Sequence, residues 1–439
     1  MYYGIVKLAP NPGPERLKYM QLHQLILYRH LLDDAILQKV QLLEQMGQEA
    51  SPCSNVSRES LYYEIFSRLI SYSEKLQLSG DIWKNYFLGL LVGDENVFSL
   101  ACENSADISP SLFQLALRDM SILLEAYERD WSSMARSISG DCIPFLNDFQ
   151  PGKADRSFNH HQQQNLIKLQ QVLIPGISPA HMTEHLAGFY TAAGCGLMNK
   201  YLAFRWDAGL VGIDTPDPVC LKDLVGYQYQ KQIITANTEA FLDGRKANNI
   251  LLYGEKGTGK SSSVKALLNE YAIRGLRLIE ISKNQLIDIQ PVLRSVKGRS
   301  RYFIVFIDDL SFEDFEIEYK YIKASIEGSL EVKPGNILLY VTSNRKNLIR
   351  ENWSERAKDD VHGFDSRQEK LSFADRFGIT ITYPSPDQEH FLAIVENLAK
   401  REGIEMPVEE LRRQALQWER KYHGRSGRSA VQFIASLNP

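Results

Sequence analysis

The chain of 439 residues has little net charge, few cysteines and no long apolar run. The formal net charge is only −4, so no strong basic field favours non-specific nucleic-acid binding, and a nucleic-acid partner is unsupported. The five cysteines are widely spaced and include no C-x-x-C pair. This pattern predicts reduced thiols rather than a disulfide framework or a zinc site.

Membrane segments and repeats are also lacking. The longest weakly polar stretch, Leu186–Asn199, is shorter than the roughly 20 residues that a membrane-spanning helix needs. The first 18 residues do not combine a basic region with an apolar one, as a secretory signal would. No internal repeat of constant period is present. We therefore expect a soluble, cytoplasmic protein with no membrane partner, divided into two or three domains.

Residues 1–200 have the apolar spacing of amphipathic helices and predict an α-helical N-terminal domain. Ser109 and Ser178 each precede a proline, which predicts a helix start with a serine cap and proline at the first helical position. Two apolar stripes illustrate the spacing: Tyr62, Ile65, Phe66, Leu69 and Ile70, then Phe113, Leu117, Met120 and Leu124.

Two features of this domain invite a functional interpretation that we do not adopt. His160 and His161 are adjacent, so on a helix their side chains would point about 100° apart and could not share a metal ion. We interpret them as polar surface. The aromatic run near Trp83 and Tyr86 is interpreted as helix core, and no catalytic constellation is predicted before residue 200.

The composition changes after residue 200. Residues 201–220 contain several prolines and glycines and are expected to form a linker. From residue 221, helical patterns alternate with short apolar runs, which predicts a parallel sheet with helices on both faces and ligands at the carboxyl ends of its strands. The expected strands are Ile250–Tyr253, Leu276–Ile281, Tyr302–Ile307, Ile337–Thr342 and Ile379–Tyr383.

A phosphate-binding loop follows the first of these strands. Residues 254–261 read GEKGTGKS, in which the glycines allow a tight turn and Lys260 can reach the β- and γ-phosphates of a nucleotide. The hydroxyl of Ser261 suits a Mg²⁺ ligand. The predicted nucleotide-binding residues of this P-loop are Gly254, Glu255, Lys256, Gly257, Thr258, Gly259, Lys260, Ser261 and Ser262.

A second motif has complementary chemistry. The apolar run 303–307 ends in Asp308 and Asp309, the form of a Walker B motif. We predict that Asp308 holds Mg²⁺ and that Asp309 polarises the attacking water as a general base. The alternative for Asp309 is that it only caps the loop that follows.

Over residues 220–436 the chain resembles the AAA+ P-loop ATPases. The segments that carry the resemblance read LLYGEKGTGKSS, FIDDLSFE, VTSNR, EKLSFADRFG and SGRSA, in that order. Within the superfamily, they are most similar to an uncharacterised bacterial group of predicted AAA+ ATP-binding proteins. The resemblance implies a P-loop core at 221–384 and a helical lid at 385–439, which the S-x-x-Q pattern from Ser385 to Gln388 would open as a capping box.

The resemblance also implies roles for single residues. Asn344 matches the polar residue that senses the γ-phosphate, and Arg376 matches the arginine that reaches a neighbouring subunit's ATP, although a surface salt bridge is the alternative. Arg428 matches the lid arginine that contacts phosphates, with Arg425 as a competitor. Residues 223–227, which read DLVGY, match the segment that lies against adenine, and Val225 and Gly226 are its predicted binding residues. Many relatives have glutamate where this chain has Asp309, so the shorter side chain requires a closer approach.

Two structural features that other AAA+ proteins use to bind their substrates are missing from the sequence. Residues 282–301 contain no aromatic residue and have room for only one short helix, which disfavours both a polypeptide-threading loop and a DNA-gripping helical insertion.

Residues 351–369 are highly charged and include Trp353 and Phe364. A solvated loop is the simpler interpretation of this stretch, and a partner-binding or switching segment is the alternative.

Together these features predict a Mg²⁺-dependent, ATP-binding and ATP-hydrolysing protein. We expect a homo-oligomer with ATP sites between subunits, whose turnover drives assembly or remodelling of an unidentified protein client. One alternative is a slowly hydrolysing ATP switch or scaffold. Another is a DNA-associated loader or accessory ATPase.

Overall fold

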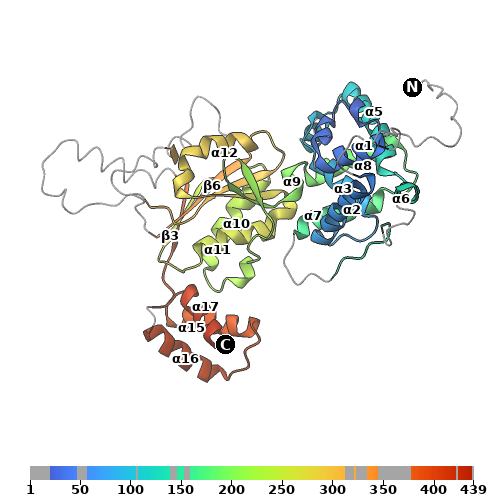
Figure 1. Ribbon diagram of the computed structural model, residues 1–439. Coiled ribbons are helices and arrows are strands. Elements are labelled where there is room, and N and C mark those ends of the chain that lie inside the picture. Colours follow the sequence, from blue (N-terminus) through green and yellow to red (C-terminus); the bar gives the residue numbers. More distant parts are fainter. Residues whose placement is uncertain are drawn as a thin grey trace. The chain divides into compact units, whose positions relative to one another are not determined.

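The computed structural model describes residues 20–46, 57–104, 107–138, 146–152, 159–311, 321–322, 334–344, 377–421 and 424–437. The chain divides into two compact units (Figure 1). The first comprises Met1–Phe98, Ile108–Ala154 and Leu166–Ala187, and the second comprises Ser99–Asp107, Asp155–Asn165 and Gly188–Pro439. The boundary that we expected at residue 200 therefore does not coincide with this division.

The helices of the N-terminal half start largely where the sequence predicts. Ser57 and Ser109 cap α2 and α5 through their side chains, and Pro110 is the first residue of α5. Ser178 caps α8, where its hydroxyl accepts from the His181 amide at 3.3 Å. Among the described helices, none combines the length and apolarity needed to cross a bilayer. The helices are α1 (Ala35–Gln45), α2 (Arg58–Lys75), α3 (Ile82–Gly93), α4 (Val97–Glu103), α5 (Pro110–Tyr127), α6 (Trp131–Ile138), α7 (His160–Val172), α8 (Pro179–Ala193) and α9 (Leu197–Lys200).

Aromatic side chains form the core of the first unit. Trp83 is 1% exposed, and its indole donates to the Ala126 carbonyl at 2.8 Å, so its interpretation as helix core is confirmed. The ring of Trp131 packs edge-on at 5.1 Å from both Trp83 and Phe66. The apolar stripe of α2 is buried as predicted, except that Ile70 is half-buried. In α5, Met120 is buried as predicted, whereas Phe113, Leu117 and Leu124 are half-buried, and Ala116 and Leu123 lie on the buried face instead.

A seven-stranded sheet forms the centre of the second unit, in the order β2-β1-β4-β5-β6-β3-β7. Every neighbouring pair is parallel except β1 and β2. This sheet, the P-loop after β3 and the C-terminal helices confirm the predicted AAA+ fold class. The strands are β1 (Ala203–Trp206), β2 (Leu210–Ile213), β3 (Ile250–Gly254), β4 (Leu276–Ile281), β5 (Tyr302–Ile307), β6 (Ile337–Ser343) and β7 (Ile379–Tyr383).

Helices cover both faces of this sheet (Figure 1). α12 (Ile289–Val296) packs on the face that carries Phe303, Val305 and Ile307. The opposite face, with Ile304 and Phe306, is covered by α10 (Gln228–Leu242) and α11 (Lys260–Tyr271). Burial on both faces explains why the central strand β5 is a continuous apolar run in the sequence.

The segment expected to be a linker carries two of the strands. Within residues 201–220, β1 pairs in parallel with β4 and in antiparallel with β2, so this segment forms one edge of the sheet. The run Ala203–Trp206 has only four residues and buries all but Arg205. So short an alternation is a weaker signal than the nearby prolines and glycines. The structure places Gly209 in the turn between the two strands, Gly212 within β2, and Pro216 and Pro218 after it.

Three C-terminal helices form a separate small core around Phe391, Val395 and Phe433. They are α15 (Gln388–Arg401), α16 (Val408–Lys421) and α17 (Gly427–Leu437). The predicted cap at Ser385 is wrong by two residues. Asp387 caps α15 instead, and its carboxylate accepts from the His390 amide at 2.8 Å. The negative charge of this carboxylate also interacts favourably with the helix dipole.

Candidate functional site

The P-loop connects β3 to α11 in the conformation that its glycines predict. Gly254, Gly257 and Gly259 have φ values of 149°, 75° and 89°, a region that favours glycine. A Cβ atom at position 254 would lie 2.0 Å from the Tyr383 carbonyl oxygen. The turn therefore needs glycine for its backbone angles and for its close approach to β7.

Lys260 points back into this loop from the first turn of α11. It is 6% exposed, and its ammonium donates to the carbonyls of Gly254 at 2.9 Å and Glu255 at 2.6 Å. A third bond, of 3.2 Å, goes to Oδ1 of Asn344 at the end of β6. Burial lowers the pKa of Lys260, and the carboxylates of Asp309 and Asp308 oppose that effect. The structure thus holds a cation inside the loop, where phosphate oxygens would be bound.

Ser261 and Asp308 meet at the carboxyl end of β5. The Ser261 hydroxyl donates to Oδ1 of Asp308 at 2.5 Å, and Thr342 donates to the same oxygen at 2.5 Å. A hydroxyl and a carboxylate are hard oxygen ligands that fit Mg²⁺. Among the described residues no group of three or more His, Cys, Asp and Glu could hold a metal ion alone. A cation here would draw its other ligands from phosphate and water, as Mg²⁺ commonly does.

Asp309 turns away from Asp308 toward Asn344. It has a φ of 51°, and its side chain is exposed. Nδ2 of Asn344 donates to Oδ1 of Asp309, while the Asn344 oxygen accepts from Lys260. The predicted general base, the predicted γ-phosphate sensor and the P-loop lysine are therefore consecutive members of one hydrogen-bond chain.

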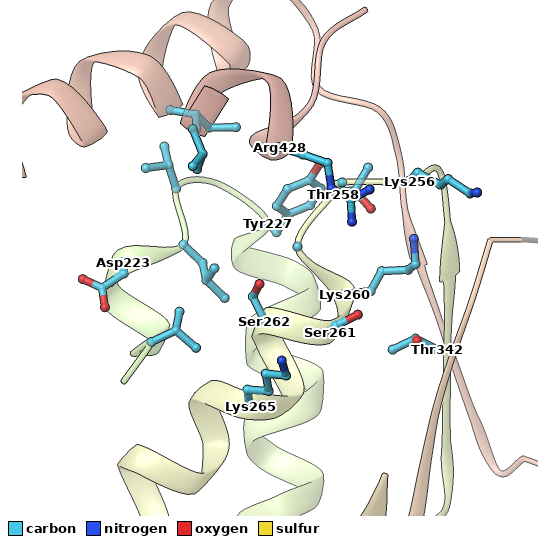
Figure 2. Close-up of a pocket in the computed structure, with 18 of the residues that line it drawn as sticks. Asp223, Tyr227, Lys256, Thr258, Lys260, Ser261, Ser262, Lys265, Thr342 and Arg428 are labelled. Atoms are coloured by element: carbon cyan, nitrogen blue, oxygen red, sulfur yellow. The ribbon is translucent and has the colours of Figure 1, made fainter. Parts of the chain in front are cut away.

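The C-terminal helices also contact the P-loop. The Gly427 amide, at the start of α17, donates to the Gly257 carbonyl at 2.8 Å. Arg428 is exposed, and Figure 2 shows it above the loop near Thr258. Arg425 instead donates to Gln388 at 3.3 Å and pairs with Glu419 at 3.3 Å. Of the two arginines, only Arg428 lines the cavity at the P-loop.

A further part of the site lies between the start of α10 and the start of α15. The His390 ring hydrogen-bonds the Val225 carbonyl at 2.9 Å and packs against Tyr227, with ring centroids 4.8 Å apart. Gly226 has a φ of 74°, and a Cβ atom there would lie 2.1 Å from Nε2 of His390. The Tyr227 hydroxyl donates to the Pro384 carbonyl at 2.8 Å. The segment of Val225 and Gly226 is thus held by the lid.

One cavity of about 620 Å³ joins these groups, within the usual range for small-molecule sites. Figure 2 shows Lys260, Ser261 and Thr342 close together in it. Gly254, Glu255 and Gly226 are not on its surface, although the first two accept from Lys260. Arg376 lies outside the described residues. The predicted residues that line the cavity are Val225, Lys256, Gly257, Thr258, Gly259, Lys260, Ser261, Ser262, Asp308, Asp309, Asn344 and Arg428.

Several lining residues were missed by the sequence analysis. Thr342 could have been found by aligning the two strands. Ile307 lies opposite Val341, so the residues that follow them, Asp308 and Thr342, lie side by side. Arg401 and the contact of His390 had no motif to reveal them. Other missed residues of the cavity wall are Val219, Lys265, Ile394, Leu398 and Val431, whereas Asp223, Leu224 and Tyr227 belong to the segment that the resemblance places against adenine.

Comparison with known proteins gives one family and a set of solved structures. The Thermotoga maritima RuvB Holliday junction branch migration motor matches with a TM-score of 0.37 and 17% identity, over 50% of this chain and 64% of that chain. A point mutant of that motor matches with a TM-score of 0.33 and 15% identity, over 50% of this chain and 72% of that one.

The first of these matches spans less than two thirds of its solved chain. No curated protein matches this chain. The profile of the family described as "Protein of unknown function (DUF815)" matches residues 199–439. Because that match takes in more than half of the chain, the protein belongs to this family.

Proposed function

We propose that this protein is a Mg²⁺-dependent ATPase of the AAA+ type that couples ATP turnover to assembly or remodelling of a protein client. One observation carries the proposal: the hydrogen-bond chain from Lys260 through Asn344 to Asp309, which lies in the same cavity as Ser261 and Asp308. A phosphate-binding cation and a candidate general base joined through one amide suit a site that binds a nucleotide and hydrolyses it.

The P-loop would bind the phosphates of ATP. The loop amides and the N-terminus of α11 provide a partial positive charge, and the buried ammonium of Lys260 adds a full one. On the base side, Val225 would lie against adenine, with the apolar side chains of Leu224 and Leu398 completing that wall of the cavity. Gly226 would contribute through the backbone turn that places Val225 there. The absence of an N-K-x-D motif from the sequence favours adenine over guanine.

Ser261 and Asp308 would hold Mg²⁺ together with the phosphates. When bound, the ion supplies charge neutralisation for the phosphoryl group that is transferred. In this chain Asp308 accepts hydrogen bonds from Ser261 and Thr342 on a single oxygen, Oδ1. The orientation of the carboxylate is therefore set by the protein rather than by the ion.

Asp309 would accept the proton of the attacking water, with Asn344 orienting both the carboxylate and the γ-phosphate. Asn344 is suited to this because its amide donates to Asp309 while its oxygen accepts from Lys260. Arg428 would neutralise phosphate charge from the lid, where it is exposed to the cavity. The base is hydrogen-bonded to Asn344, and its carboxylate also acts electrostatically on the buried ammonium of Lys260.

The intersubunit part of the proposal rests on the sequence. Arg376 would enter the ATP site of a neighbouring copy, which makes a homo-oligomer necessary for full activity. We assign client recognition to the helical domain of residues 1–200, catalysis to residues 221–384 and the lid to residues 385–439. Residues 201–220 connect the first two and add the strands β1 and β2 to the sheet.

An affinity capture experiment tests this function. Asp309→Asn should bind ATP, hydrolyse it poorly and so retain the client, whereas Lys260→Ala, the matched control, should bind neither ATP nor client. A protein enriched with Asp309→Asn in the presence of ATP and lost with Lys260→Ala supports the proposal. Tight ATP binding with negligible turnover by the parent protein would favour a switch or scaffold. Hydrolysis that DNA stimulates would favour a DNA-associated accessory role.

A further inference from the structure

Thr342 is buried at the junction of the two acidic residues and has no role in the predicted motifs. It is the penultimate residue of β6 and is 1% exposed. In the parallel pair of β5 and β6, Ile307 lies opposite Val341. The next residues of the two segments, Asp308 and Thr342, therefore also lie opposite each other. Thr342 thus lies directly beside Asp308, at the carboxyl edge of the sheet.

Three hydrogen bonds connect this one residue to three successive residues after β5. Its hydroxyl donates to Oδ1 of Asp308 at 2.5 Å and accepts from the Asp309 amide at 2.9 Å. Its carbonyl accepts from the Leu310 amide at 2.8 Å. A hydroxyl has one proton and two lone pairs, so the two side-chain bonds are compatible. A side chain that only filled space would not need both.

The bond to the Asp309 amide supports an unfavourable backbone conformation. Asp309 has a φ of 51°, a left-handed angle that costs a non-glycine residue about 1–2 kcal/mol. Such an angle persists where surrounding contacts compensate for it. The left-handed turn points the Asp309 side chain toward Asn344 rather than along Asp308. Thr342 thus helps to determine where the proposed base points.

The bond to Asp308 determines how that carboxylate is presented. Ser261 and Thr342 both donate to Oδ1. In the part of the chain that the structure describes, the other oxygen, Oδ2, accepts no hydrogen bond. With one oxygen held by two hydroxyls, the carboxylate cannot rotate freely, and Oδ2 remains available to a cation.

We propose that Thr342 is a positioning residue that orients the Mg²⁺ ligand Asp308 and the base Asp309 together through its single hydroxyl. This inference rests on the proposed function, because it assigns Thr342 a part in the same reaction. Thr342 would not touch substrate; it acts through the two carboxylates. Its hydroxyl should matter and its methyl group should not.

The test compares Thr342→Val, which keeps the shape and removes the hydroxyl, with Thr342→Ser, which keeps the hydroxyl. In the full-length protein, the valine variant should lower kcat by about 10–100-fold, the range found for groups that orient metal ligands. It should also raise the Mg²⁺ concentration for half-maximal activity, while the KM for ATP changes by less than about 3-fold. The serine variant should restore kcat to within about 3-fold of the parent.

Thr238→Val is the matched control. Thr238 is also fully buried, and its hydroxyl is bonded to the Ile234 carbonyl at 2.8 Å and to the Tyr340 hydroxyl at 2.9 Å, but it does not line the cavity. Its loss should reduce thermal stability without changing the Mg²⁺ dependence. If Thr342→Val does not fold, Thr342→Ala is judged by the same criterion.

The outcomes separate this inference from the proposed function. Parent-like kcat and Mg²⁺ dependence in Thr342→Val, or equal impairment in Thr342→Ser, would overturn the role of Thr342. If the parent itself hydrolyses no ATP, the proposed function fails, and a fluorescent ATP analogue then provides the test. The valine variant should bind it equally without Mg²⁺ but lose the enhancement that Mg²⁺ gives the parent; an unchanged enhancement would overturn the inference.

Discussion

The side-chain amide of Asn344 donates a hydrogen bond to Oδ1 of Asp309 across the gap between the ends of β6 and β5. The oxygen of the same amide accepts from Lys260 at 3.2 Å. The planar amide of Asn344 therefore connects the proposed base, Asp309, to the phosphate-binding cation, Lys260. A shift of either side chain should move the other through this amide.

Removal of that amide should separate hydrolysis from binding. In Asn344→Ala we expect kcat to fall by about 10²-fold, the scale seen when one aligned donor is removed from a catalytic site. ATP affinity should change little, because Lys260 keeps its carbonyl partners in the loop. Steady-state kinetics beside equilibrium ATP titration provide the check. A loss of affinity with kcat unchanged would show that Asn344 acts only in binding.

His390 should affect affinity rather than the chemical step. Its ring bonds to the Val225 carbonyl and packs on Tyr227, away from the acidic residues. His390→Ala should weaken ATP binding by about 5–10-fold, the worth of one hydrogen bond, with kcat within about 3-fold of the parent. Gly226→Ala should act in the same direction, because its Cβ atom would meet the His390 ring. Isothermal titration with ATP measures both; unaltered affinity in both variants would exclude a role for this contact.

The second unit contains a buried ion pair that should give its stability a specific pH dependence. Glu103 is fully buried, and its two carboxylate oxygens accept from Nε and a terminal nitrogen of Arg299, each at 2.7 Å. The Cys195 amide adds a bond of 2.9 Å. Burial raises the pKa of Glu103, but Arg299 and Cys195 together lower it below the ordinary value of 4.5.

A depressed pKa in the folded state means that the ion pair stabilises the unit fully above about pH 4.5 and loses that contribution as the pH falls through the folded pKa. Glu103→Gln should lower stability by about 3 kcal/mol at pH 7, because it leaves a buried guanidinium without its partner. The difference from the parent should shrink below about pH 4.5, where Glu103 of the unfolded parent takes up a proton while the folded carboxylate is still ionised, until the folded carboxylate is protonated as well.

Hydrogen exchange of β4 and β5 amides, corrected for the intrinsic rate at each pH, measures this difference. The matched control is Glu280→Gln, an exposed glutamate on β4, which should change stability by less than about 0.5 kcal/mol. A difference between parent and Glu103→Gln that stays constant from pH 7 to pH 4 would contradict the linkage.

Arg376 should act on a neighbouring copy. Specific activity should rise with protein concentration, and Arg376→Ala should lower kcat by about 10³-fold or more. Mixing Arg376→Ala with Lys260→Ala should recover part of the activity, because a P-loop from the first variant can meet the arginine of the second. Recovery is measured against each variant alone at the same total concentration. If mixing restores nothing, the arginine does not act between subunits.

Much of the nucleotide-binding part could be predicted because buried strands and strand ends leave strong signals. The runs 276–281, 302–307 and 379–383 are strands over the predicted residues. The second run is wholly apolar, the first is apolar except for Arg277 and Glu280, and the third alternates apolar residues with threonine. Asp308, Asp309 and Asn344 follow such runs directly, so topology alone brings them to one edge.

The rest depends on contacts between residues far apart in the sequence. The pairing of Glu103 with Arg299 spans nearly two hundred residues and draws the end of α4 into the second unit, which no periodicity reveals. Strand β1 has only four residues, and its partner β4 determines its structure more than its own sequence does. Likewise, Asp387 replaced Ser385 as the helix cap because both types can cap and only the path of the chain decides between them.

Steady-state phosphate release from ATP by the full-length protein tests the central claim most directly. With Mg²⁺ present, the parent should release phosphate continuously, and Asp309→Asn should be slower by about 10²-fold or more while it binds ATP with parent-like affinity. Removal of Mg²⁺ with a chelator should stop the parent. If Asp309→Asn releases phosphate as fast as the parent, or if the parent turns over equally well without Mg²⁺, the account of this site is contradicted.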